Sequence, residues 1–190
     1  MKKSIGANTA LYPTPAVLVG TYDQQGKPNI MTVAWAGICC SKPPCVGIAL
    51  RKATYTFGCL MGRQAFTVSI PSEEHVRVVD YCGVVSGRDE DKFAACKLTP
   101  VKADKVDAPY VQEFPVILEC QVRHVLEIGL HTQFVGEILD VKVEESLLDP
   151  SGKPDVTRIK PIFYAPMLQL YFGTGPQLIK AFTVRAAPTG

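Results

Sequence analysis

Residues 51–56 combine the side chains that proteins use to bind a phosphate group. The cationic and hydroxyl side chains in this stretch are Arg51, Lys52, Thr54, Tyr55 and Thr56. An apolar run over residues 45–50 precedes them and a helical pattern follows, so a strand ends here and a helix begins. Helix N-terminal amides, hydroxyls and cations together form a phosphate site. The plainer alternative is a capped helix whose basic neighbours are solvated.

A second polar stretch, residues 86–93, could serve the same kind of site. Ser86 and Gly87 would expose backbone amides, and Lys92 could reach an anion. The alternative is a solvated loop that leads into a short helix. Residue spacing favours neither interpretation.

Residues 29–35 form a strand-like run that ends in the only tryptophan of the chain, Trp35. A flat ligand ring needs planar and apolar surface around it, with backbone amides facing its polar edge. This segment could supply such a surface. The alternative is a core strand with a buried tryptophan.

His131 stands at the predicted start of a strand, beside a turn. A lone histidine is more often structural than catalytic. Gly136 in the same strand would let another backbone or a ligand approach closely. We keep this strand as a candidate wall of a ligand site.

Seven cysteines occur, and their spacing indicates neither a metal centre nor a disulfide framework. The number is odd and no C-x-x-C pair is present. Zinc and iron–sulfur sites need paired thiolates, and structural disulfides need an oxidising compartment. We therefore expect no bound metal and mostly buried, free thiols. Cys39, Cys40 and Cys45 flank a proline break, where an exposed thiol could be redox-active.

The chain has the length and composition of one folded domain. It has 190 residues, of which 47% are hydrophobic and 20% are charged. The formal net charge of +2 is too small for a polybasic nucleic-acid surface. No apolar stretch approaches the roughly 20 residues of a membrane span, and the N-terminus lacks the apolar region of a signal peptide. We expect a single domain over residues 1–190 that is cytoplasmic and has no nucleic-acid or membrane partner.

The elements that must position these side chains are mostly strands. Apolar, β-branched runs predict strands at residues 16–22, 29–40, 45–50, 65–70, 116–127, 131–144, 162–164 and 168–172. Two helices are predicted as inserts, one capped by Thr54 and closed by Gly62, the other capped by Ser72. Residues 41–44 break the chain, because their prolines cannot donate to a ladder. Helices do not alternate with strands, which favours an antiparallel barrel.

Taken in order along the chain, these segments resemble the flavin reductase-like family, whose domain is an FMN-binding split barrel. The similarity runs from about Tyr12 to Phe182. The segments that carry it are residues 29–35, 42–44, 51–56, 86–89, 92–93 and 135–138. The resemblance implies a mainly β, antiparallel, Greek-key split barrel with a few short helices. It also implies non-covalent FMN and a homodimer with the flavin near the subunit interface.

The resemblance assigns roles to individual residues. The isoalloxazine ring would be lined by Thr32, Val33, Ala34 and Trp35, with Asn29 in the same segment. The phosphate and ribityl chain would be held by Arg51, Lys52, Thr54, Tyr55 and Thr56, beside Ser69 and Pro71, with polar contacts from Ser86, Gly87 and Lys92. His131, Phe163 and Tyr164 would lie near the exposed flavin edge. His131 is the candidate catalytic residue, although FMN itself carries the redox chemistry.

Three functions are compatible with this reading. The first is an FMN-dependent oxidoreductase that carries electrons to or from a redox protein partner. The second is an NAD(P)H-dependent flavin or ferric reductase, in which nicotinamide would stack on the open flavin face near His131. The third is a non-catalytic FMN-binding module.

Overall fold

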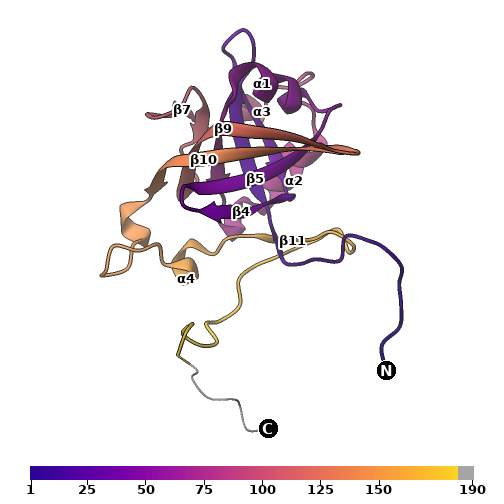
Figure 1. The fold of residues 1–190 in the computed structure, drawn as a ribbon. Coiled ribbons are helices and arrows are strands. Elements are labelled where there is room, and N and C mark those ends of the chain that lie inside the picture. The colour runs from indigo at the N-terminus through magenta and orange to yellow at the C-terminus, as the bar shows by residue number, and fades with distance from the viewer. Residues whose placement is uncertain (184–190) are drawn as a thin grey trace.

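The computed structural model describes residues 1–183, and its main feature is a seven-stranded antiparallel sheet rolled into a barrel (Figure 1). The strands lie in the order β3-β2-β6-β9-β10-β5-β4. Their bounds are Val17–Tyr22 (β2), Pro28–Val33 (β3), Ala36–Ser41 (β4), Pro44–Arg51 (β5), Ala65–Ile70 (β6), Val116–Ile128 (β9) and His131–Val143 (β10). The prediction of a mainly β, antiparallel fold with a few short helices is confirmed.

The two edge strands of this sheet are consecutive in the chain. Only Ala34 and Trp35 separate β3 from β4, so the chain passes from one edge of the sheet directly to the other. The amide of Ala49 in β5 donates to the carbonyl of Trp35 (2.8 Å) and fixes this crossing. Closure of this kind protects the sheet edges. The single strand predicted over residues 29–40 is therefore wrong, because a corner divides it into two strands on opposite edges.

The predicted break at residues 41–44 is the turn of the β4–β5 hairpin, in which Ser41 pairs with Pro44. Pro44 is the first residue of β5, a position where a strand tolerates a missing donor.

The remaining strands form smaller sheets. They are β1 (Thr14–Pro15), β11 (Phe163–Ala165) and β12 (Leu170–Phe172) in one, and β7 (Pro100–Lys102) with β8 (Pro109–Val111) in another.

Short helices cover one side and the ends of the barrel. They are α1 (Tyr55–Arg63), η1 (Glu73–His75), α2 (Val76–Val84), α3 (Lys92–Ala95), η2 (Glu145–Leu147) and α4 (Val156–Ile159). Helix α1 continues past Gly62 to Arg63, and Gln64, whose φ is 55°, supplies the left-handed residue that follows it. The hydroxyl of Ser72 bonds the side chains of Glu74 and His75, so it does not cap a helix as predicted.

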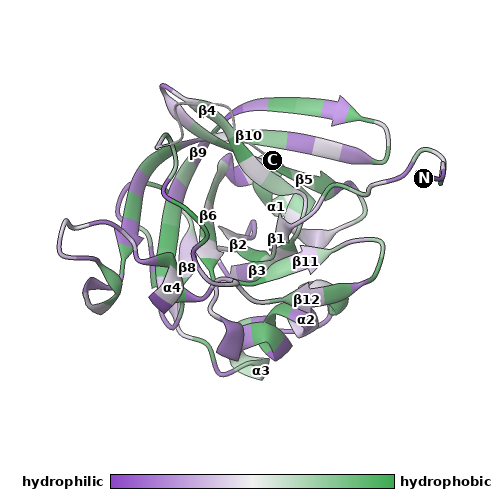
Figure 2. Cartoon of the chain, turned by 90° about the horizontal axis from the view of Figure 1, so that it is seen from below, coloured by the Kyte–Doolittle hydropathy of each residue, from purple (hydrophilic) through white to green (hydrophobic). Residues whose placement is uncertain are grey.

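Two apolar clusters stabilise the barrel. One lies inside it and includes Ile48, Phe66 and Phe134, while the other lies between the sheet and α2 and includes Leu18 and Val79. Strand β2 is buried along its length because one of its faces points into each cluster. Figure 2 shows hydrophobic segments alternating with hydrophilic ones along the barrel strands.

The β9–β10 hairpin projects beyond the barrel (Figure 1). Strand β6 begins at Ala65, opposite Gln121, so the end of β9 pairs only with β10. The apolar side chains exposed at this tip are Val125, Leu126, Ile128 and Leu130. Within residues 1–183, no helix is long and apolar enough to cross a membrane.

Candidate functional site

Two adjoining hollows lie where β3 and β5 end and α1 begins. The first, which we call the Trp35 hollow, has a volume of about 460 Å³ and is lined by Thr9, Met31, Thr32, Val33, Ala34, Trp35, Ala49, Leu50, Arg51, Thr54, Gly83, His131, Tyr164 and Pro166. The second, the Lys92 hollow, has a volume of about 340 Å³ and is lined by Met31, Arg51, Ala53, Thr54, Tyr55, Thr56, Gly83, Val84, Val85, Ser86, Gly87, Arg88, Asp89 and Lys92. They share Met31, Arg51, Thr54 and Gly83, so they form one groove of a size that small-molecule sites have.

Strand register brings the walls of the Trp35 hollow together. Strand β10 places His131 opposite Arg51 of β5, and the corner between β3 and β4 places Trp35 beside Ala49. The rings of Trp35 and His131 are 6.3 Å apart between centroids. The sequence predicted that residues 32–35 surround a flat ring. These residues lie in one hollow with His131.

The start of α1 faces the Lys92 hollow without a side-chain cap. Thr54 holds the extended N-cap conformation, but its hydroxyl donates to the carbonyl of Arg51 (2.9 Å) and not toward the helix. The first amides of a helix have no partner within the helix, and the dipole makes this end attractive to an anion. The hydroxyl of Tyr55 donates to Asp23 (2.9 Å). The face of the Tyr55 ring therefore stays available to a ligand. Burial raises the pKa of that phenol.

The loop between α2 and α3 supplies the opposite wall. Its turn is closed by amides of Asp89 and Glu90 that donate to the carbonyl of Ser86 (both 3.1 Å). Asn29 lies beneath it, nearly buried, and its Nδ2 donates to Oγ1 of Thr56 (2.9 Å). Its Oδ1 has no hydrogen-bond partner in the described part of the chain, and it faces Gly87 so closely that a methyl group on Gly87 would collide with it. Only glycine fits this position without a shift.

Lys92 brings a nearly buried positive charge to this hollow. Its side chain is only 4% exposed, and its Nζ donates to the carbonyls of Cys82 and Val85 (both 3.1 Å). An ammonium has three donors, so one remains free. No carboxylate lies within 4 Å of Nζ among residues 1–183. Burial lowers the pKa of the ammonium. A bound anion would supply the missing opposite charge.

Four of the residues predicted to bind the cofactor line neither part of this groove, and one of them is Asn29, described above. Lys52 forms an ion pair with Glu127 (2.6 Å) and lines a neighbouring hollow with Asp23. Ser69 is buried, and its hydroxyl accepts from the amide of Val111 (3.2 Å). Pro71 is buried just beyond β6 and lines neither part of the groove.

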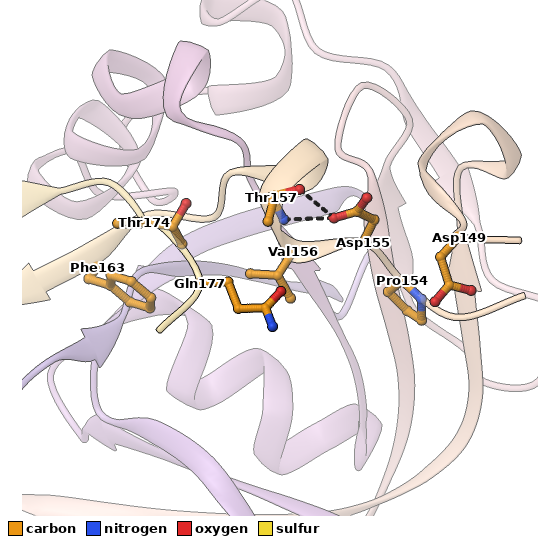
Figure 3. Close-up of a pocket in the computed structure, with 9 residues that line it drawn as sticks. Asp149, Pro154, Asp155, Val156, Thr157, Phe163, Thr174 and Gln177 are labelled. Atoms are coloured by element: carbon orange, nitrogen blue, oxygen red, sulfur yellow. Dashed lines mark hydrogen bonds between the residues drawn. The ribbon is translucent and has the colours of Figure 1, made fainter. Parts of the chain in front are cut away.

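Phe163 and Tyr164 point into different hollows, because neighbouring residues of a strand face opposite sides. Tyr164 lines the Trp35 hollow, as predicted. Phe163 lines a larger hollow of about 670 Å³ beside α4 and Thr174 (Figure 3). Figure 3 shows that the carboxylate of Asp155 in this hollow is already bonded by the amide and hydroxyl of Thr157.

Several lining residues were not predicted from the sequence. Met31 and Gly83 lie at the junction of the two hollows, and Arg88 adds a cation that lies over the Tyr55 ring, 5.9 Å from its centroid. Gly83 carried no local signal, since only the packing of α2 against Thr32 places it here. Arg88 lies within residues 86–89, one of the segments that carry the family resemblance. Its positive charge was the signal that could have identified it.

The cysteines show no arrangement for a metal. Cys39 and Cys40 are exposed on β4, whereas Cys45 is buried on β5. The thiol of Cys39 donates to the carbonyl of Cys45 (3.5 Å). Within residues 1–183, no three histidine, cysteine or acidic side chains gather in a way that could hold a metal ion.

The family model described as "Flavin reductase like domain" matches residues 9–167. The chain belongs to the flavin reductase-like family. A flavoredoxin of Desulfovibrio vulgaris (Miyazaki F) is 55% identical, with a TM-score of 0.93 over 96% of this chain and 98% of that one. Flavoredoxin from Methanosarcina acetivorans is 31% identical, with a TM-score of 0.90 over 96% of both chains.

A ferric-chelate reductase (NAD(P)H) of Archaeoglobus fulgidus is also similar to this chain. It is 29% identical over 104 residues, which cover 54% of this chain and 60% of the relative. Together the family and these relatives support a flavin-related oxidoreductase.

Proposed function

We propose that the chain binds FMN without a covalent link and transfers electrons through it. The observation that carries this proposal is the position of Lys92 at one end of the groove, as a nearly buried ammonium with no carboxylate partner among residues 1–183. The other end is lined by apolar and aromatic side chains, including Trp35. A phosphate joined through a polyol chain to a flat ring would meet matching surfaces in this order.

The residues of the groove would bind and orient this ligand. Arg51 and Lys92 would neutralise the phosphate, and hydroxyls of Thr54 and Ser86 would bond the phosphate and ribityl chain, with each charge-assisted bond contributing about 1.5–3 kcal/mol. Trp35 would cover the ring. When bound, FMN would supply the ring that accepts and releases electrons. No side chain of the groove has to act as a nucleophile.

We propose an electron carrier as the form this chemistry takes, and the two flavoredoxin relatives favour it. Gel filtration of the purified protein tests cofactor binding first, and we expect FMN to remain bound. Anaerobic stopped-flow absorbance then tests the donor. Reduction by reduced ferredoxin, without fast bleaching by NADH or NADPH, is expected for a carrier, and dithionite gives the spectrum of the fully reduced protein for reference. A protein that retains no flavin would contradict the proposal.

A reductase is the second candidate, and the ferric-chelate reductase relative favours it. Fast bleaching by NADH or NADPH would establish this function in place of the carrier and would make His131 a nicotinamide-side candidate. A flavin that no physiological donor reduces would indicate a non-catalytic module. Because each function gives a different absorbance trace, one set of measurements separates all three.

We further propose a cytoplasmic homodimer in which the β9–β10 hairpin tip forms the subunit contact. The support for the dimer is the exposure of Leu126, Ile128 and Leu130, which are 51%, 58% and 64% exposed. Neighbouring apolar side chains on a projecting element are typical of protein contact surfaces. His131 follows this tip directly, so a partner bound there would lie beside the groove.

A further inference from the structure

Three cysteines lie together on the β4–β5 hairpin, and the function proposed above uses none of them. Cys39 and Cys40 are exposed on β4, whereas Cys45 on β5 is only 7% exposed. None of the three lines either part of the groove. An exposed thiol is open to reagents in solution, whereas a buried thiol is reached only through its neighbours. The hairpin therefore offers thiol chemistry that is separate from the groove.

The register of the hairpin places Cys40 directly opposite Cys45. Side chains of directly opposed residues stand on the same face of a β-ladder. The Cα atoms of such pairs are about 4.5 or 5.5 Å apart, according to the kind of pair, and a disulfide requires roughly 4.4–6.8 Å. Either kind of pair therefore allows a disulfide between Cys40 and Cys45 without a large movement of the backbone.

Cys39 does not hold this position, because a register shift takes it out of the ladder. The shift lies between Ile38 and Cys40, so Cys39 is the extra residue of a bulge and has no residue directly opposite. Its thiol donates to the carbonyl of Cys45 (3.5 Å). Cys39 is thus held against the β5 backbone, while Cys40 faces Cys45 across the ladder.

Cys40 and Cys45 differ in how a reagent can reach them. The thiol of Cys40 is held by a weak hydrogen bond to the carbonyl of Lys42 in the turn (3.4 Å). Rotation about its Cα–Cβ bond breaks this bond and turns the sulfur across the ladder. Burial raises the pKa of the Cys45 thiol, which keeps it protonated until a reacting group comes close. Cys40 is therefore placed to react first with a molecule from solution, and Cys45 to react second.

We propose that Cys40 and Cys45 form a thiol–disulfide exchange site for a low-molecular-weight disulfide of the glutathione type. The Cys40 thiolate attacks one sulfur of the small disulfide, forms a mixed disulfide and releases the other half, which takes up a proton. The Cys45 thiolate then attacks the sulfur of Cys40 and releases the second half, which also takes up a proton. One disulfide bond forms in the protein and one breaks, and two electrons with two protons pass to the small molecule.

The test mixes the reduced, desalted protein with oxidised glutathione in the absence of oxygen, and intact mass spectrometry after acid quenching gives the result. Every variant carries Cys39→Ser, because the exposed thiol of Cys39 would otherwise take up glutathione by itself. We expect Cys39→Ser to lose the mass of two hydrogens. Cys39→Ser/Cys45→Ser should stop with one glutathionyl group added, and Cys39→Ser/Cys40→Ser should keep its original mass.

Two controls deal with other thiol pairs and with loss of the fold. Cys39→Ser/Cys82→Ser removes a buried thiol of α2 and should close as Cys39→Ser does. Cys39→Ser/Cys45→Ala buries no hydroxyl and should trap the same mixed disulfide as the serine variant. Circular dichroism checks that each variant is folded.

Two results would overturn the inference. One is a mixed disulfide that persists in Cys39→Ser, and the other is a loss of two hydrogens that survives the replacement of Cys45. The exchange does not require a flavin, and the readout is the mass of the chain. A protein that closes this disulfide but retains no FMN would therefore leave the exchange site standing and remove only the proposed function.

Discussion

Lys92 is the residue whose setting bears most directly on the proposed phosphate. Lys92→Met should weaken FMN binding by about 10- to 100-fold, because one charge-assisted bond of roughly 1.5–3 kcal/mol is lost. Arg51→Ala should weaken it less, because Arg51 is exposed to solvent. Fluorescence titration with FMN measures both. Unchanged affinity in both variants would remove the phosphate assignment.

The lowered pKa of Lys92 also gives a pH dependence with a defined sign. Burial favours the neutral amine in the flavin-free protein, so the ammonium loses its proton below the usual 10.5. FMN affinity should therefore fall as the pH rises through this lowered pKa. The Lys92→Met variant should not show this fall. In the same window the unfolded chain binds more protons at this lysine than the folded protein does, so Lys92 should make the free energy of unfolding of the flavin-free protein rise with pH relative to that of Lys92→Met. Urea titrations of both proteins at several alkaline pH values check this difference, which identical pH profiles would contradict.

Gly87 tests whether the close approach of the loop to Asn29 matters for ligand binding. Gly87→Ala would bring a methyl group against Oδ1 of Asn29 and within 3.1 Å of the Tyr55 ring, so the loop must move away from the groove. We expect at least a severalfold loss of FMN affinity by fluorescence titration. Gly62→Ala is the control, because nothing lies within 4 Å of its added carbon. It should keep full affinity and gain up to about 1 kcal/mol of helix stability. Equal affinity in both variants would show that the loop adapts freely.

At the scale of the element, the β9–β10 pairing depends on a close approach at Gly136. The register shifts between Val135 and Gly136, and an added carbon at Gly136 would lie 2.5 Å from Cζ of Phe66 and 3.1 Å from Cβ of Cys120. Phe66 is fully buried and cannot withdraw. Gly136→Ala should lower the free energy of unfolding by about 1–3 kcal/mol in urea. Gly37→Ala on β4 meets nothing within 4 Å and should stay within about 0.5 kcal/mol. Equal urea midpoints for the two variants would mean that the barrel repacks around the added methyl group.

Strands were the elements that the sequence predicted best, because their signal is local. The long strands β9 and β10 begin at the predicted residues and end within one residue of the predicted limits. The corner at Ala34 and Trp35 had no such signal, because apolar residues continue through it and only barrel closure requires the bend. The end of α1 was misplaced for a related reason. Gly62 is the better left-handed residue, but the helix runs on to Arg63 and Gln64 takes the left-handed conformation.

The candidate site was predictable where one segment carried several contacts. Residues 32–35 and 54–56 each enter the groove as a run, so their position in the sequence located them. Single residues were harder to place. Lys52 turns toward Glu127 on the hairpin, a partner 75 positions away in the chain, and Phe163 faces away from Tyr164 across one strand. Such outcomes depend on strand register and tertiary packing, which a local pattern does not contain.

At the scale of the whole molecule, the proposed dimer links assembly to cofactor binding. The exposed hairpin tip ends at Leu130, and the next residue, His131, lines the groove. A partner that covers the tip would therefore exclude water from this end of the groove, so dimerisation and FMN binding should strengthen each other. Wild-type protein should sediment as a dimer and release FMN more readily when it is diluted below its dimer dissociation constant.

The double variant Leu126→Glu/Leu130→Glu tests this linkage, because two like charges on the tip oppose association and would be costly to bury. We expect a folded monomer in analytical ultracentrifugation, with weaker FMN binding than the wild type at high protein concentration. Val156→Glu is the control, since Val156 is a similarly exposed apolar residue (53%) on α4. It should remain dimeric and keep its flavin. A wild-type protein that sediments as a monomer would remove the dimer. A monomeric variant with unchanged affinity would show that one chain completes the groove alone, so that exclusion of water by the partner contributes nothing to holding the cofactor.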